Sequence, residues 1–298
     1  MAPRPFPDPT KSPLGALTMA YQDYDLLDTW VRYYEKQVGR AHLYVFSHGD
    51  DPEHRRIAEG TNIIALPRDA TLTQFERRRW FLLTQFTNGL LRYYNWIITS
   101  DVDELVVLDP DQGDSLTGYL ARYEGGPAPR SISPFGVEIL HNPDLEPDPL
   151  VPGGRVLDKR SLFRVNANYA KPCLVRQDVS FTNGGHANNH QPRFLDDHLY
   201  LMHLRFYDYD RSCARLSGRA DLRQDTDARE TQNQWAKNIA TYKKLALQTP
   251  RETTIHFPEF RRRMLEEAQD LHNGKVTFFG GGRSKDLYRL PDRFTALF

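Results

Sequence analysis

The fold is decided at Trp96-Ile97-Ile98-Thr99-Ser100-Asp101-Val102-Asp103-Glu104-Leu105, where an apolar segment runs directly into three acidic residues. Acidic side chains in this position are costly to bury unless a positive charge neutralises them. Residues two apart in an extended chain point to the same side, so Asp101 and Asp103 can converge on one cation. Carboxylate oxygens suit Mg²⁺ or Mn²⁺, which bind substrate phosphates through one or two carboxylates. The pattern predicts a metal site; a solvated acidic turn is the alternative, because a bare Asp-x-Asp is common.

Strands and helices alternate before this segment. The chain has strand patterns at Leu14–Tyr21, His42–Phe46 and Asn62–Leu66, and apolar residues recur at helical spacing in Tyr24–Val38 and Gln74–Tyr94. Such alternation predicts an α/β fold with a mainly parallel sheet sandwiched by helices. Loops at the carboxyl ends of parallel strands bind ligands in folds of this kind.

The chain is expected to divide into three parts. Residues 1–13 are rich in proline and polar residues and predict a flexible leader. Residues 14–212 would form the main domain, with one half at about 14–110 and a second at about 111–212. Residues 213–298 would form a basic, mainly helical extension.

Charge is distributed unevenly although the formal net charge is zero. Arg211 and the residues after it include 17 Lys and Arg against 11 Asp and Glu, so this part carries +6 and residues 1–210 carry −6. The basic part suits an anionic surface, which predicts peripheral contact with the inner face of a membrane. Two solvated faces of unequal charge are the alternative. No nucleic-acid-binding motif is found, so no nucleic-acid partner is expected.

Cysteine content and hydropathy indicate the compartment. The two cysteines, Cys173 and Cys213, argue against a disulfide framework and against a zinc cluster of several thiolates. The leader lacks the apolar core of a signal peptide, and no stretch approaches about 18 apolar residues. We therefore expect a cytoplasmic protein.

Several positions, in order along the chain, resemble a known family. They are Leu26-Leu27-Asp28-Thr29-Trp30 with Tyr33-Tyr34, then Trp96 through Glu104, Phe135-Gly136, Arg160, Lys171-Pro172, Gly185-His186 and His203. In this order they resemble the glycosyltransferase family 2-like proteins with a GT-A fold, close to the family 92 type. The resemblance spans roughly residues 14 to 212, and its specific element is the Asp-x-Asp-Glu stretch. It implies a donor half followed by an acceptor half.

The resemblance also implies a set of metal ligands. A cation would bridge Asp103, together with Asp101, to the diphosphate of a nucleotide sugar and would stabilise charge on the leaving nucleotide. GT-A families often add a late histidine to the metal, and His203 matches that position after Leu199–Met202. A half-buried His203 bonded to backbone is the alternative. His186 is a competing ligand or an acceptor-site residue, with a polar glycine loop as its alternative.

The donor would contact further residues before and after the metal motif. Tyr21 and Asp50 lie where an aromatic face and an acid could hold base and ribose. Arg77, within Arg77-Arg78-Arg79, and Lys171 are candidate phosphate ligands. Core packing for Tyr21 and a solvated helix face for Arg77 are the alternatives.

An inverting enzyme needs a carboxylate within reach of the acceptor hydroxyl. Glu138 is the first candidate for this catalytic base, and Asp197 with its neighbour Asp196 is the rival. The sequence leaves inverting and retaining chemistry both open.

Together these features predict a metal-dependent glycosyltransferase for glycan biosynthesis. It would move a sugar from a nucleotide-diphosphate sugar, with uridine favoured, to a hydroxyl of a glycan or other acceptor. A metal-dependent nucleotidyl- or phosphotransferase is one alternative, although no glycine-rich phosphate loop precedes a helix. A catalytically silent binding module, docking through Arg261-Arg262-Arg263, is another.

Overall fold

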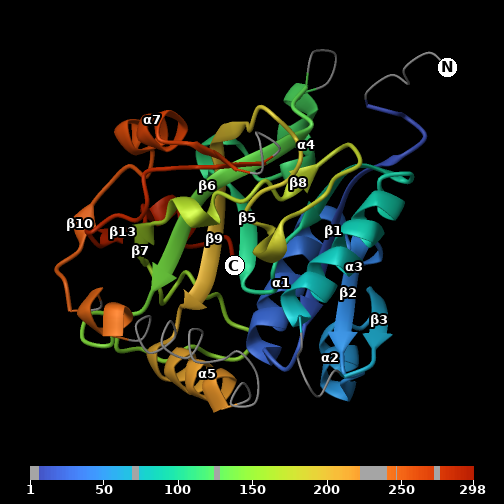
Figure 1. Cartoon of the computed structure of the whole chain (residues 1–298). Helices are drawn as coiled ribbons and strands as arrows, with labels where there is room; N and C mark the ends of the chain where they lie inside the picture. Colours follow the sequence, from blue (N-terminus) through green and yellow to red (C-terminus); the bar gives the residue numbers. More distant parts are fainter. Residues whose placement is uncertain (1–6, 69–73, 124–127, 222–239, 246, 272–275) are drawn as a thin grey trace.

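A computed structural model describes the chain apart from residues 1–6, 69–73, 124–127, 222–239, 246 and 272–275 (Figure 1). Its first part is a parallel sheet in the strand order β4-β1-β2-β3. The strands are β1 (Ser12–Ala20), β2 (Leu43–His48), β3 (Asn62–Leu66) and β4 (Tyr94–Thr99). The connecting helices are α1 (Tyr24–Val38), α2 (Pro52–Ile57) and α3 (Phe75–Leu90). The predicted α/β alternation is therefore present in this half.

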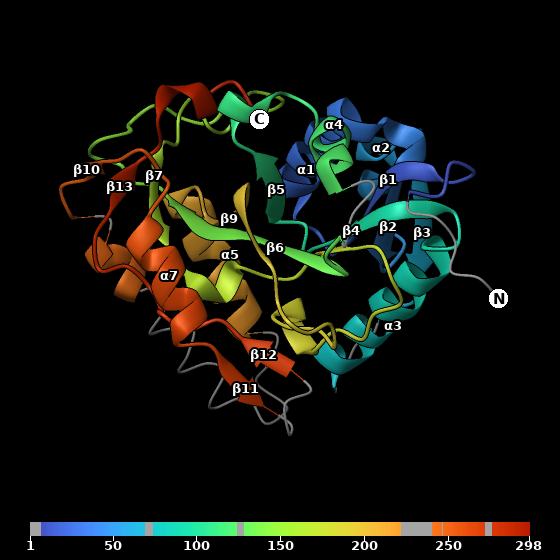
Figure 2. The same ribbon diagram turned by 90° about the horizontal axis from the view of Figure 1, so that it is seen from above.

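Successive apolar side chains of β1 contact helices on opposite faces of the sheet. Ala16 belongs to one apolar cluster with Trp30 of α1, whereas its neighbour Leu17 packs in another cluster with Trp80 of α3. Successive strand residues point to opposite faces, so β1 is buried on both sides. Figure 2 shows α1 and α2 on one face of these strands and α3 on the other.

Beyond β4 the sheet becomes mixed. It continues through β8 (Leu174–Val175), β6 (Ser131–Leu140) and β7 (Leu162–Val165), with β9 (Leu195–Phe206) beside β6 and β5 (Glu104–Leu108) beside β9. β6 and β9 are parallel, while β4–β8, β6–β8, β6–β7 and β5–β9 are antiparallel. The predicted α/β sheet is therefore present, with parallel pairs in the first half and a mixture of parallel and antiparallel pairs in the second.

The remaining elements include α4 (Leu116–Leu120) and α5 (Tyr209–Asp221). Short 3-10 segments are η1 (Arg40–His42), η2 (Pro110–Gln112), η3 (Ala121–Tyr123), η4 (Ala167–Tyr169), η5 (Asn183–Gly185) and η6 (Asp292–Phe294). Among the described helices, none is long and apolar enough to cross a membrane.

The last part of the chain corrects the expected helical extension. α7 (Pro258–Glu266) is followed by the antiparallel pair β11 (Gln269–Leu271) and β12 (Val276–Phe278). β10 (Arg251–Glu252) and β13 (Tyr288–Arg289) pair with each other, and β13 joins the main sheet through β7. Phe294 and Phe298 are buried in the principal core. Within the described residues, this part therefore contains both helix and strand. Its apolar residues belong to the principal core, and β13 extends the main sheet.

Candidate functional site

A cavity of about 500 Å³ opens where β1, β2 and β4 end. Its walls come from the loops after these strands, from α3, from the η4 and η5 region, and from α5. Lining residues include Tyr21, Asp23, His48, Arg68, Phe75, Glu76, Arg79, Asp101, Asp103, Glu104, Tyr169, Lys171, His186, His203, Arg205 and Arg215. This is the edge at which open α/β sheets bind ligands. The lining includes residues beyond 212, so it crosses the boundary expected from the sequence.

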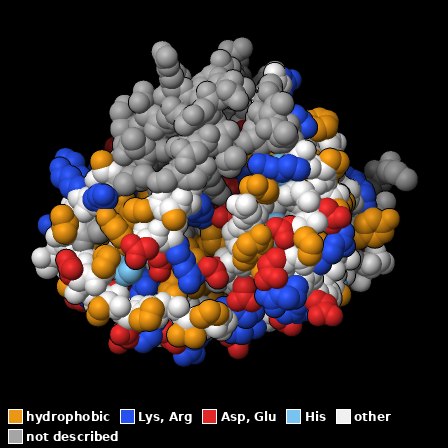
Figure 3. All heavy atoms as spheres, turned by 90° about the horizontal axis from the view of Figure 1, so that it is seen from below, with side chains coloured by type: hydrophobic (Ala, Val, Ile, Leu, Met, Phe, Trp, Pro, Cys, Tyr) orange, Lys and Arg blue, Asp and Glu red, His pale blue; other side chains and the backbone are white. Residues whose placement is uncertain are grey.

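Figure 3 views the molecule from below, the end toward which β2 points in Figure 1. Lys and Arg side chains are interleaved with Asp and Glu over the described surface of this face. The uneven charge of the sequence therefore does not gather into a region of one sign on this described surface.

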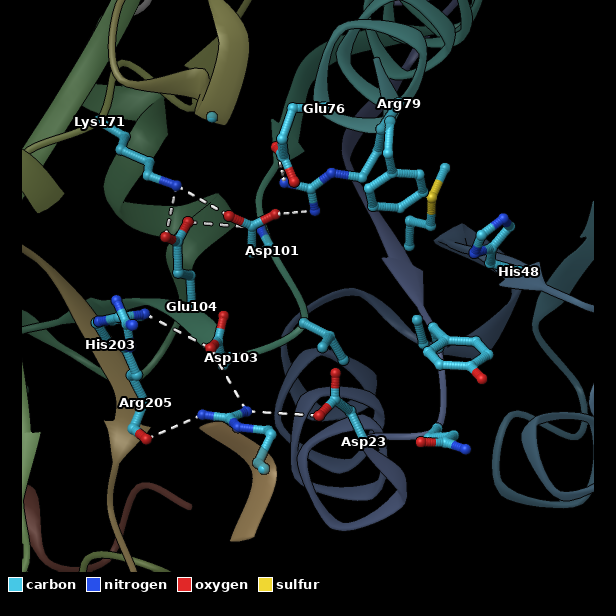
Figure 4. A pocket seen from close by; sticks show the side chains of 18 of the residues that line it. Asp23, His48, Glu76, Arg79, Asp101, Asp103, Glu104, Lys171, His203 and Arg205 are labelled. Carbon is cyan, nitrogen blue, oxygen red and sulfur yellow. Dashed lines mark hydrogen bonds and ion pairs between the residues drawn. The ribbon is translucent and has the colours of Figure 1, made fainter. Parts of the chain in front are cut away.

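The acidic motif forms a turn between β4 and β5. The Glu104 backbone N–H donates to the Asp101 carbonyl at 3.0 Å, closing the turn, and Val102 is buried. The extended-strand geometry expected for Asp101 and Asp103 is therefore corrected. Both carboxylates line the cavity, but they meet different partners (Figure 4).

Asp101 lies between two fixed cations. Arg79 Nη1 donates to Oδ1 at 2.5 Å, and Lys171 Nζ donates to Oδ2 at 3.0 Å. Burial alone would raise the pKa of Asp101, but the charges of Arg79 and Lys171 outweigh it and lower the pKa to about 2. Asp101 is thus ionised and already neutralised by protein groups.

Lys171 also binds Glu104, with Nζ 2.6 Å from Oε1. Both side chains are almost completely buried. Burial raises the pKa of Glu104 to about 7 against the opposing charge of Lys171. Lys171, predicted as a phosphate ligand, is therefore held between two carboxylates of the acidic motif.

His203 emerges from β9 beside Asp103. Its Nε2 is 3.5 Å from Asp103 Oδ2, and its ring stacks on Tyr169 with centroids 3.8 Å apart. Burial would lower the pKa of His203, but Asp103 and Glu138 together raise it. Ligand atoms of Asp103, Glu104 and His203 all lie within 4.8 Å of one another. Among the described residues this is the acid and histidine group spaced to hold one metal ion, and it contains Glu104 where the sequence predicted Asp101.

The two predicted catalytic carboxylates do not line the cavity. Glu138 is 1% exposed, pairs with Arg164 and lies behind His203. Asp197 is exposed near the start of β9, and its neighbour Asp196 is buried and bound by the hydroxyl groups of Tyr119 and Tyr123. A general base has to reach the proton that it removes, so this geometry does not support either Glu138 or Asp197 in that role.

Aromatic and basic side chains form one end of the cavity. The Arg68 guanidinium lies 3.7 Å from the ring centroid of Tyr21 and its Nη1 is 3.2 Å from Nδ1 of His48. His48 stacks on Phe75, with centroids 5.1 Å apart. Tyr21, the predicted base contact, therefore lines the cavity, together with Arg68 and Phe75, which were not among the residues predicted for the site. His48 is the last residue of β2.

Two predicted donor contacts lie outside the cavity lining. Asp50 is exposed and paired with Arg55, and Arg77 is exposed on α3. Arg79 lines the cavity in place of Arg77, because it lies four residues before Leu83 on the buried side of α3. Helical spacing relative to the apolar face could have identified this arginine.

His186 lines the cavity but lies outside the metal-spaced group. Its Nδ1 is 2.8 Å from the Asn168 carbonyl oxygen. Burial and then the charge of Lys171 lower the pKa of His186 to about 4, so the ring is neutral near pH 7. The preceding Gly185 lies against Trp80 of α3, where an added Cβ would be 2.2 Å from the indole ring.

Comparisons with known proteins give a limited result. No family model matches the chain, and no curated protein matches it. One solved structure that it resembles in part is the apo form of the bifunctional glycosyltransferase WbbM, at 12% identity and a TM-score of 0.26. The match covers 45% of this chain and 24% of that chain. A likeness of this extent carries no argument about the reaction.

Proposed function

We propose that the chain is a metal-dependent glycosyltransferase that uses a nucleotide-diphosphate sugar. The observation that carries this proposal is the pair Asp103 and His203, with Glu104 beside them, in a cavity at the carboxyl ends of parallel strands. Oxygen and imidazole ligands in one small group suit Mn²⁺ or Mg²⁺. Asp103 and His203 would hold the ion, and Glu104 is the nearest further carboxylate.

The spacing of these ligands fits one ion. Metal–ligand distances of about 2.0–2.2 Å bring ligand atoms on opposite sides of an ion to roughly 4–4.4 Å, and the ligand atoms of this group all lie within 4.8 Å of one another. Asp101 is a weaker candidate than the sequence suggested, because both of its oxygens are paired with cations. When bound, the ion would offset negative charge on the diphosphate leaving group.

The shape and lining of the cavity fit a nucleotide donor. Its volume of about 500 Å³ lies within the range of small-molecule pockets. Tyr21, His48 and Phe75 offer aromatic faces for a base, and Arg68 adds a cation beside them. We favour uridine diphosphate sugars as donors and a glycan or other hydroxyl compound as the acceptor.

The alternative functions lack equivalent support. Gly280-Gly281-Gly282 lies outside the cavity lining, and Gly280 packs against the Glu267 backbone. Arg261 is buried and donates to the carbonyls of Asp196 and His256, while Arg262 pairs with Glu259 and Glu266. The glycine run therefore offers no phosphate loop at this site, and two arginines of the basic triplet are already engaged.

A donor screen tests the proposal. The full chain is incubated with several nucleotide sugars, with Mn²⁺ or with a chelator, and release of the nucleoside diphosphate is measured. We expect hydrolysis of at least one uridine diphosphate sugar with Mn²⁺ and its loss with chelator. Nucleotide-sugar cleavage that is unaffected by the chelator would contradict the proposed metal dependence. Release of a nucleoside monophosphate together with a sugar 1-phosphate would favour the nucleotidyl- or phosphotransferase class, because it reports cleavage at phosphorus instead of at the sugar carbon.

A further inference from the structure

Three neighbouring strands bring Glu104, His203 and Glu138 into one row. β5 and β9 pair with Glu104 opposite His203, and β6 and β9 pair with Glu138 opposite His203. Directly opposite residues on paired strands have their side chains on the same face of the sheet. His203 therefore stands between two carboxylates, one on each side.

A basic side chain is paired with the carboxylate at each end of this row. Lys171 binds Glu104, and Arg164 binds Glu138 through both Nε and Nη2. All five side chains are at most 5% exposed. Buried carboxylates are tolerated when they are paired in this way, so the row can keep a charged group beside the histidine.

The two oxygens of Glu138 have different partners. Oε2 accepts from Arg164, whereas Oε1 is 3.4 Å from Nδ1 of His203. On the other side of the ring, Nε2 is 3.5 Å from Asp103 in the cavity, and Tyr169 stacks on the ring face. The ring thus has Tyr169 on one face and Glu138 as the carboxylate nearest to Nδ1, a buried nitrogen for which no other hydrogen-bond partner is found, while Nε2 is directed to the acidic motif (Figure 4).

We propose that Glu138 is a positioning residue that accepts the Nδ1–H of His203 and so keeps the Nε2 lone pair for the metal ion. This inference rests on the proposed function and assigns Glu138 a role different from the catalytic base expected from the sequence. Carboxylates behind metal-bound histidines fix the ring tautomer, and their loss typically lowers metal affinity by roughly 10–100-fold.

Glu138 could act by positioning His203 or only by neutralising the charge of Arg164. Two substitutions of Glu138 distinguish these roles. Glu138→Gln removes the negative charge but keeps an oxygen acceptor for Nδ1–H, whereas Glu138→Leu removes both. Mn²⁺ binding is measured by isothermal titration and by electron paramagnetic resonance. We expect Glu138→Leu to weaken Mn²⁺ binding by roughly 10–100-fold and Glu138→Gln to recover most of that loss.

A matched control is Asp109→Asn. Asp109 is also 1% exposed and paired with an arginine, Arg293 at 2.7 Å, but it does not line the cavity. Its variant should lower stability and leave Mn²⁺ affinity unchanged. Equal losses in Glu138→Gln and Glu138→Leu, or wild-type affinity in both, would overturn the positioning role.

Spectra of the unmodified protein test the inference without relying on a folded variant. ¹⁵N-histidine spectra with saturating Mg²⁺ should show the proton of His203 on Nδ1, with the signal assigned by its loss in His203→Gln. If the Mg²⁺-saturated protein instead carries the proton on Nε2, the positioning role of Glu138 is wrong. The proposed function would still stand in that case, provided that the wild type binds Mn²⁺. Absence of Mn²⁺ binding by the wild type, with and without uridine diphosphate, would instead overturn the proposed function and this inference with it.

Discussion

Lys171 is the residue on which the acidic motif depends most. Its ammonium group contacts both Asp101 and Glu104, and its side chain is 2% exposed. Removing one member of a buried ion cluster leaves uncompensated charge in a poorly solvated place. We therefore expect the lysine to stabilise the fold and to fix the positions of Asp101 and Glu104 in the cavity wall.

Lys171→Met should lower the free energy of unfolding by about 3–5 kcal/mol, as expected for breaking a buried pair. Urea denaturation followed by circular dichroism measures the change. The control is Lys159→Met, because Lys159 pairs with Asp148 at the exposed surface and should contribute little. Similar losses for both lysines would contradict the importance of burial.

Sequence patterns found some residues of the site and missed others for physical reasons. Asp103 and His203 could be identified because each follows an apolar strand run. Arg68 could not, since its position over Tyr21 depends on how the loops after β1 and β3 meet. Glu138 was expected to act on substrate, but strand register turns it toward His203, and register is not visible in one strand alone.

At the scale of elements, the contact between η5 and α3 positions the loop that carries His186. Gly185 has a φ of +65° and faces the ring of Trp80, which is 2% exposed. A side chain at this position would be strained by its backbone conformation and would have no space. The close approach needs glycine for both reasons.

Gly185→Ala should therefore lower stability by ~1–3 kcal/mol, measured by urea denaturation. Gly89→Ala, on the same helix as Trp80, is the counterpart: an added Cβ meets nothing within 4 Å there. It should raise stability by about 0.5–1 kcal/mol, because alanine suits a helix better than glycine. A neutral effect of Gly185→Ala would show that the loop can move away from α3 at little cost.

The length of an element decided whether it could be predicted from the sequence. β1 to β4, which have five to nine residues each, were recognised because their apolar residues alternate along the chain with helical patterns. β7, β8, β10 and β13 have two to four residues each and carry too little periodicity to be distinguished from loops. The parallel first half could thus be predicted, whereas the second half, where parallel and antiparallel pairs are mixed, depends on contacts between distant segments.

At the scale of the whole molecule, buried neutral histidines make stability depend on pH. His190 is 4% exposed and its Nε2 is 2.9 Å from the Asp178 carbonyl oxygen. Burial, followed by the charges of Arg130 and Arg176, lowers the pKa of His190 to about 4 from 6.5. Between these values the unfolded chain binds a proton that the folded protein does not, so this histidine's contribution to stability is lost as the pH falls.

His190→Gln should therefore flatten the decline of stability with acid. The free energy of unfolding is measured at several values between about pH 7 and pH 4 for wild type and variant, and the difference isolates this group from other titrating residues. The slope should be shallower by up to one proton in the variant. Parallel curves would show that His190 titrates alike in both states.

We propose that one cation links Asp103 to the diphosphate of the donor. Isothermal titration of uridine diphosphate into wild type and Asp103→Asn, each with Mn²⁺ and with a chelator, tests this link. We predict that Mn²⁺ raises nucleotide affinity at least about fivefold in the wild type, as coupled ligands typically do. The variant should lose this effect while its melting temperature shows a folded protein. Nucleotide binding that is indifferent to Mn²⁺ in the wild type, or full coupling retained in Asp103→Asn, would contradict the claim.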